Sequence, residues 1–146
     1  MIDELELFRF INKCKHLKYK FQGVYAADNF PLNFKDYCFI IVNSDKSNQL
    51  GTHWLLLCKR NNMIPFGDPL GLPITYYPYI CDRLSYADLG FAEIIKNPLQ
   101  KTDSSLCGLY CIYIAHYVFS AYFPSIPYIS EQELLRFVKH FVWCKN

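Results

Sequence analysis

The run Leu106–Phe123 carries no formal charge, and it constrains the fold more than any other feature of the sequence. Its eighteen residues reach the lower limit for a membrane-spanning helix, which is about 17 residues. Gly108, His116 and Ser120 interrupt its apolar character, and no basic residue directly precedes it. We therefore expect a buried central helix, packed inside a globular domain rather than in lipid.

The composition is that of one domain spanning residues 1–146. Apolar residues make up 52% of the chain and aromatic residues 18%, which excludes wholesale disorder. The formal charge of +2 neither requires nor excludes a nucleic-acid partner. One basic cluster predicts a solvated helix end and linker, with binding of nucleic acid or of an acidic partner as the alternative. This lysine cluster consists of Lys13, Lys15, Lys18 and Lys20, with His16 among them.

The cysteines indicate a reducing, intracellular environment. Their number, seven, is odd, their spacing is irregular and no signal peptide precedes them, so we expect mostly buried free thiols. Cys111 and His116 are not accompanied by a C-x₂-C or H-x₃-H pair, and we therefore expect no metal site. We also expect a monomer that binds no membrane.

Hydrophobic periodicity and turn residues divide the chain into helices and strands. The predicted helices cover residues 3–15, 73–89 and 106–122, and a last one opens at the capping box of residues 130–133. The predicted strands cover residues 37–42, 52–59, 63–67 and 91–96, with structured loops at 22–25 and 28–31. This order predicts an α+β fold, in which a small mixed β-sheet packs between helices.

Cys107 stands where a polar, turn-forming stretch meets the start of the central helix. Backbone N–H groups in a first helical turn lack partners and carry partial positive charge, which favours a thiolate over a thiol. Cys111 lies one turn further along the helix, away from such N–H groups, and is expected to be a small core residue. Cys107 is therefore the candidate nucleophile.

His53 and Asp68 form a candidate pair of base and orienting acid. A two-residue hairpin loop at Asn61-Asn62 brings both side chains to one face of the sheet, diagonally across from each other. A carboxylate there would accept the Nδ1 proton of the imidazole and raise its basicity. A different loop length, or a bulge at Pro65, would instead place Asp68 on the opposite face. The pairs in the predicted register are Arg60–Met63, Leu57–Phe66 and Leu55–Asp68.

Gln100 precedes Cys107 by seven residues, and its side-chain amide is a candidate oxyanion donor beside the Cys107 backbone N–H. Gly108 lacks a side chain that would crowd a reacting carbonyl. The remaining histidines are expected to have other roles: His16 is expected in solvent, His116 in the core or a groove, and His140 at the surface.

Six blocks of the sequence occur in the same order as in one known protein family. They are Phe21–Tyr25 with Phe30-Pro31, Ile40–Asn43, Gly51–Trp54, Asp68–Gly71, Gln100 and Cys107–Cys111. In this order and spacing the chain resembles the adenovirus maturation protease (adenain) and its superfamily. That superfamily includes the SUMO-specific proteases and the predicted proteases of Maverick/Polinton-type viral elements.

The resemblance implies an adenain-like cysteine protease fold whose central helix carries the nucleophile. It implies a viral or virus-derived thiol endopeptidase that cleaves capsid or virion precursor proteins at small, Gly-containing sites, in the virion and in the host cell nucleus or cytoplasm. The implied catalytic roles are His53 as base, Asp68 as orienting acid, Cys107 as nucleophile and Gln100 as oxyanion donor. The implied substrate-binding residues are Gly51, Trp54 and Gly108, with a plain core role as the alternative for Trp54.

The chain also departs from adenain. Asp68 stands where adenain has Glu, as in the SUMO-protease branch, and residues 90–100 contain no cysteine that would tether a peptide cofactor. No cofactor is expected for the chemistry, and activation by a peptide or DNA is left open. The alternative functions are an isopeptidase acting on SUMO or ubiquitin conjugates, and a catalytically silent binding module on the same fold.

Overall fold

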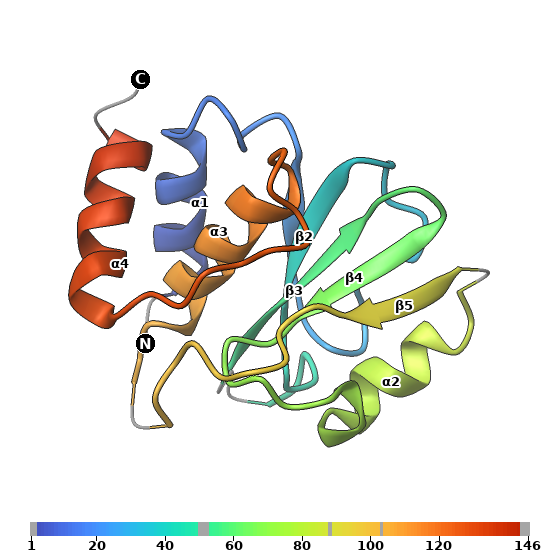
Figure 1. Cartoon of the computed structure of the whole chain (residues 1–146). Coiled ribbons are helices and arrows are strands. Elements are labelled where there is room, and N and C mark those ends of the chain that lie inside the picture. The colour runs from blue at the N-terminus through green and yellow to red at the C-terminus, as the bar shows by residue number, and fades with distance from the viewer. Residues whose placement is uncertain (1–2, 50–52, 88, 103, 144–146) are drawn as a thin grey trace.

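A five-stranded mixed sheet forms the centre of the molecule (Figure 1). The computed structural model describes residues 3–49, 53–87, 89–102 and 104–143. The spatial order of the strands is the chain order, and the two outer pairs, β1–β2 and β4–β5, are parallel while the inner pairs are antiparallel. The strands are β1 (Phe21–Tyr25), β2 (Cys38–Asn43), β3 (Trp54–Lys59), β4 (Met63–Gly67) and β5 (Gly90–Glu93).

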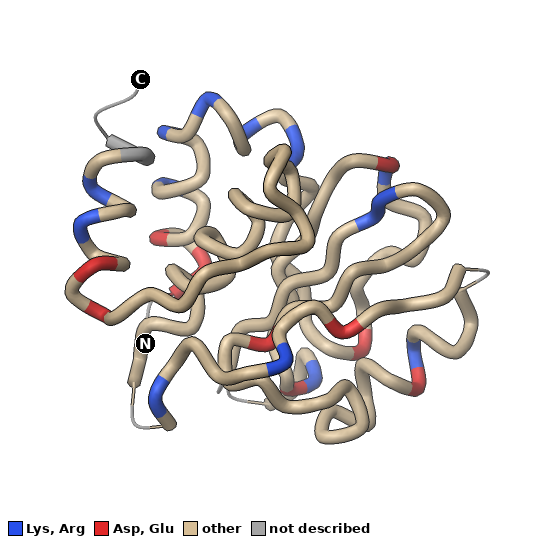
Figure 2. The backbone as a smooth tube through the Cα atoms, in the orientation of Figure 1, with Lys and Arg blue, Asp and Glu red and all other residues tan. Residues whose placement is uncertain are grey.

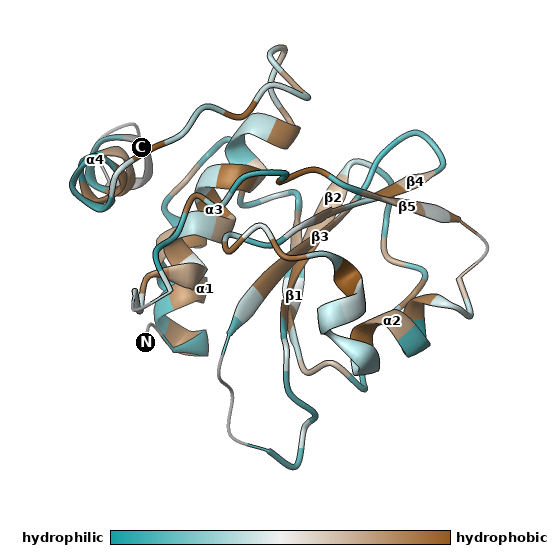
Figure 3. Ribbon diagram, turned by 60° about the horizontal axis from the view of Figure 1, so that its bottom comes forward, coloured by the Kyte–Doolittle hydropathy of each residue, from teal (hydrophilic) through white to brown (hydrophobic). Residues whose placement is uncertain are grey.

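Helices cover both faces of the sheet, which confirms the predicted α+β architecture (Figures 1 and 3). One face carries α1 (Glu4–Asn12), α3 (Cys107–Val118) and α4 (Glu131–Phe137), and α4 continues into the π-helical turn η2 (Val138–Trp143). The other face carries the short 3₁₀ helix η1 (Ile74–Tyr76) and α2 (Pro78–Leu84).

Strand β3 separates two hydrophobic cores. Trp54, Leu56 and Cys58 pack with α1 and α3, whereas Leu55 and Leu57 pack with α2 on the opposite face. Because both faces are covered, the strand is apolar from Trp54 to Cys58 and does not alternate between polar and apolar residues there.

Helix α3 is the central helix predicted from the uncharged run, and all but two of its residues are buried. It ends at Val118, four residues earlier than predicted, where Arg60 donates a hydrogen bond to the Val118 carbonyl oxygen. Within the described part of the chain, none of the helices is long and apolar enough to cross a bilayer.

Some elements differ from the prediction. Residues 21–25 form an edge strand rather than a loop, because they pair with β2 through an irregular register around Gly23, whose φ is +118°. Residues 73–89 are not one helix, because Pro78 lacks an N–H and begins a new helix at its first turn. The predicted start of β3 at Thr52 lies outside the described residues.

Candidate active site

His53 and Asp68 meet at the end of the β3–β4 hairpin that lies away from its loop. The hairpin has the predicted register, with Leu57 paired to Phe66. Asn61 and Asn62 adopt positive φ values of 50° and 63°, as a two-residue loop requires. The imidazole Nε2 of His53 lies 2.7 Å from Oδ1 of Asp68.

The prediction that Nδ1 of His53 contacts the carboxylate is wrong, because Nε2 makes this contact. The imidazole also forms a hydrogen bond with the thiol of Cys107. A single imidazole therefore bridges the acid and the thiol.

Asp68 is only 1% exposed, yet its carboxylate is well supplied with partners. The backbone N–H of Leu70 donates to Oδ1 at 2.9 Å, and the hydroxyl of Tyr77 donates to Oδ2 at 2.5 Å. These hydrogen bonds, with that from His53, compensate for the cost of burying a charged group. Tyr77 was not predicted from the sequence as a site residue.

Tyr77 also contacts the base itself, since its ring stacks near the His53 imidazole with centroids 6.2 Å apart and planes 22° apart. Burial, together with the hydrogen bond to Asp68, raises the pKa of Tyr77 well above its usual value. The hydroxyl therefore stays protonated and donates to the carboxylate.

Cys107 is the first residue of α3 and is buried beside the β3 backbone. The Trp54 N–H donates to its Sγ at 3.4 Å, and the Trp54 carbonyl oxygen accepts from the Cys111 thiol at 3.4 Å. Burial raises the pKa of Cys111 well above its usual value, which keeps this second thiol protonated. The Cys107 sulfur thus lies near a base, whereas the Cys111 thiol stays protonated and donates to the backbone.

The turn at Asp68–Gly71 brings the backbone of Gln100 close to Asp68. The carbonyl oxygen of Pro69, inside this turn, accepts from the backbone N–H groups of both Leu99 and Gln100 at 2.9 Å. The turn needs glycine, because Gly71 has a φ of +71° and a Cβ there would lie 2.9 Å from the nitrogen of Pro98.

The Gln100 side chain is 5% exposed and is fixed by a hydrogen bond of 2.9 Å from its Nε2 to the Ser104 carbonyl oxygen. Its Oε1 is buried without a hydrogen-bond partner among the described residues. An amide nitrogen carries two hydrogens, so Nε2 keeps a second N–H for a reacting oxyanion.

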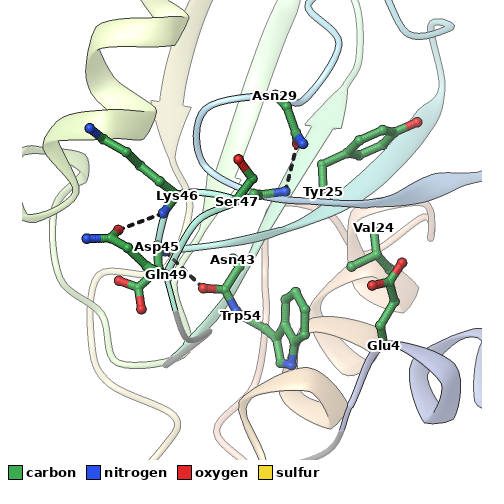
Figure 4. Close-up of a pocket in the computed structure, with 11 residues that line it drawn as sticks. Glu4, Val24, Tyr25, Asn29, Asn43, Asp45, Lys46, Ser47, Gln49 and Trp54 are labelled. Carbon is green, nitrogen blue, oxygen red and sulfur yellow. Dashed lines mark hydrogen bonds between the residues drawn. The ribbon is translucent and has the colours of Figure 1, made fainter.

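Trp54 is buried in the core, and its indole also lines a pocket of about 360 Å³. Figure 4 shows the indole between Asn43 and Glu4 on the wall of this pocket. Both of its predicted roles, core residue and cleft wall, are therefore compatible with the structure. Gly108 is buried as the second residue of α3, and Gly51 lies outside the described residues.

The other predicted histidine positions are away from this cluster. His16 and His116 contact each other, with ring centroids 5.2 Å apart, near the last turn of α3. Burial, followed by the charge of His16, lowers the pKa of His116. In the described part of the chain, no group of three His, Cys, Asp or Glu side chains is arranged to hold a metal ion.

The electrostatics of His53 are set by opposing effects. Burial lowers its pKa, but the hydrogen bonds to Asp68 and Cys107 and the charges of these groups outweigh burial and raise the pKa from 6.5 to about 9. The imidazole is therefore protonated at neutral pH, which is the state needed to donate a proton to a leaving group.

Together, the sheet, the central helix and the residues at its start define the SUMO-protease/adenain-like cysteine protease fold. A crystal structure of the ASFV pS273R protease shares this fold, with a TM-score of 0.51 and 16% sequence identity, over 85% of this chain and 60% of that chain. A selenomethionine crystal structure of the same protease matches at a TM-score of 0.44 and 18% identity, over 71% of this chain and 44% of that chain.

The chain thus spans less than two thirds of the length of each of these protease chains. No protein family matches the sequence, and no curated protein matches it either. At this low identity the likeness concerns the fold alone.

Proposed function

We propose that this chain is a viral or virus-derived cysteine endopeptidase that matures virion precursor proteins. The observation that carries the proposal is the His53 imidazole, which bridges a buried carboxylate and the thiol at the start of α3. The shared fold with a viral protease supports the assignment. The resemblance of the sequence blocks to adenain supports virion precursors, cleaved at Gly-containing sites, as the substrates.

The proposed reaction begins when the Cys107 proton passes to Nδ1 of His53, or is already there in an ion pair. The thiolate attacks the amide carbon, and the resulting oxyanion accepts hydrogen bonds from the Gln100 amide and the Cys107 backbone N–H. The His53 imidazolium then protonates the leaving amine, and the carbon–nitrogen bond breaks. Water, deprotonated by His53, finally hydrolyses the thioester and restores the thiol.

Selective alkylation tests the proposed nucleophile. Iodoacetamide at mildly acidic pH should label Cys107 first, although Cys107 is buried and Cys81 is partly exposed. Labelling of Cys81 before Cys107 would show that accessibility alone controls reactivity, and would favour the catalytically silent module.

Substrate choice tests the proposed class of protease. Gly-containing virion precursor peptides should be cleaved by the intact chain and not by Cys107→Ser, which should keep its fold. Preferential cleavage of fluorogenic SUMO or ubiquitin would instead identify an isopeptidase. Failure to cleave either substrate class would contradict the endopeptidase proposal.

A further inference from the structure

Two adjoining hollows lie on the Gln100 side of the candidate active site. The first, of about 570 Å³, includes Gln100 itself in its wall. The second, of about 250 Å³, shares Pro98, Leu99 and Tyr128 with the first and therefore continues from it. We call the combined hollow the Gln100 groove. Besides these four residues, the wall nearest the site includes Leu70 and Lys101.

The walls of this groove are tied to the elements that hold the catalytic side chains. On one side, the N–H groups of Leu99 and Gln100 bind the Pro69 carbonyl oxygen, next to Asp68. On the other side, the Tyr113 hydroxyl of α3 donates to the Pro127 carbonyl oxygen at 2.8 Å, and Tyr128 follows directly. A groove fixed in this way needs little reordering when it binds a ligand.

The described charged residues along the groove are both lysines. Lys101 lines its first part and Lys96 its second, and no Asp or Glu is found among the described residues of either wall. The pocket beside Trp54 differs, because Glu4 and Asp45 line it together with a single lysine, Lys46 (Figure 4). The pocket at Trp54 and the Gln100 groove thus offer different charge environments to a bound polypeptide.

A polypeptide cleaved at Cys107 has to leave the site in two directions. One hollow is lined by Trp54, whose N–H contacts the Cys107 sulfur, and the other by Gln100 and by Leu70, whose N–H contacts Asp68. We propose that the Gln100 groove is a specificity subsite that holds the substrate on one side of the scissile bond and selects acidic side chains through Lys101. This inference rests on the proposed function. Tyr128, which is 67% exposed, offers its ring as a contact surface where the two parts of the groove meet.

Paired peptides test the proposal in two independent assays. Each pair differs by Asp or Lys at one position, within three residues on either side of the scissile bond. Cleavage is measured with the intact chain, and binding with Cys107→Ala by fluorescence anisotropy at low salt. On one side of the scissile bond, and not on the other, the Asp peptide should be cleaved and bound better than the Lys peptide. The difference should be roughly two- to fivefold, as expected for an exposed ion pair.

Charge reversal locates the effect. Lys101→Glu should reverse the preference for Asp over Lys peptides, mainly through KM. Lys18→Glu makes the same charge change near the far end of α3 and should leave this preference unaltered. Tyr128→Ala should weaken binding of both members of a pair. Unchanged preference in Lys101→Glu would overturn the subsite while leaving the endopeptidase intact. If Lys101→Glu reverses the binding preference but no peptide is cleaved, the groove is supported and the endopeptidase is contradicted. If the peptides are neither bound with a preference nor cleaved, both proposals are contradicted.

Discussion

The Tyr77 hydroxyl donates to Oδ2 of Asp68, the carboxylate oxygen that His53 does not contact. The residue comes from the linker between η1 and α2, whereas the other members of the cluster come from the β3–β4 hairpin and α3. Its ring lies near the imidazole at the same time. Tyr77 therefore fixes the acid and limits the movement of the base.

Replacing Tyr77 by Phe should slow catalysis without unfolding the protein. The variant keeps the ring that packs near His53 and Phe66 but loses the hydrogen bond to a charged group, worth about 1.5 kcal/mol. We expect kcat to fall about tenfold. Tyr76→Phe, at an exposed neighbouring position, is the control and should keep full activity. Equal kcat values for Tyr77→Phe and wild type would remove Tyr77 from the site.

The pKa of His53 predicts how stability depends on pH. Because the folded-state pKa is raised from 6.5 to about 9, the stabilisation from the imidazolium is complete below pH 6.5 and is lost as the pH rises through about 9. Urea unfolding at several pH values should show this loss in wild type. Asp68→Asn removes a main cause of the raised pKa and should show a smaller loss over the same interval. If the unfolding free energies of wild type and Asp68→Asn changed equally with pH, the raised pKa of His53 would be contradicted.

The same pKa predicts an alkaline limit of activity. The imidazolium that protonates the leaving amine is depleted in the free enzyme above pH 9, so kcat/KM should fall there. A pH–rate profile of peptide cleavage measures this limit. An alkaline limb below pH 7 would be incompatible with the ion-paired imidazole.

The contact between His53 and Asp68 could be predicted from sequence because it depends on local rules. Asparagine tolerates positive φ, so Asn61 and Asn62 fix the loop length. Strand alternation then determines which side chains share a face. The choice of Nε2 over Nδ1 could not be predicted in this way, because it depends on the position of the thiol on another element.

Other features depend on contacts between distant segments. Tyr77 reaches Asp68 only because Pro78 interrupts the predicted helix and leaves a non-helical residue before it, with φ −123° and ψ 76°. Strand β1 exists only through its pairing with β2. Neither contact leaves a periodic signal in its own segment, so hydrophobic patterning does not detect them.

Removing the Gln100 amide should affect catalysis far more than stability. Gln100→Ala deletes an oxyanion donor, and loss of one such donor costs about 2.7–4 kcal/mol of barrier. We therefore expect kcat to fall by about 10²–10³, while the melting temperature changes little. Gln132→Ala, at an exposed position on α4, is the matched control. Unchanged turnover in Gln100→Ala would exclude it as the oxyanion donor.

Binding of nucleic acid, the alternative role of the lysine cluster, would be a separate and salt-dependent interaction. His16 contacts His116 and Lys20 lies over the Phe119 ring, so this segment packs at the last turn of α3. Cys107 is at the opposite end of that helix, roughly 16 Å away at about 1.5 Å per residue. Figure 2 shows the basic residues of this segment along one edge of the molecule.

Nucleic acid bound at that edge would leave the active site accessible. We expect Lys15→Glu with Lys18→Glu to weaken binding of a short duplex and to reduce its salt dependence, because fewer phosphates are neutralised. Cleavage of an uncharged peptide should stay unchanged. Filter binding at several salt concentrations measures the effect, and binding equal to that of wild type would exclude the lysine cluster as the contact.

Arg60 should contribute to stability and not to catalysis. Its guanidinium donates to the Val118 carbonyl oxygen at the end of α3 and lies 4.8 Å from the Phe123 ring centroid. Arg60→Met keeps much of the aliphatic packing but leaves this carbonyl without its charged donor, which should cost about 1–2 kcal/mol of unfolding free energy. Since Val118 and Cys107 lie at opposite ends of α3, kcat should be retained. A loss of kcat larger than the loss of folded protein in urea unfolding would show that the end of α3 is coupled to its catalytic start.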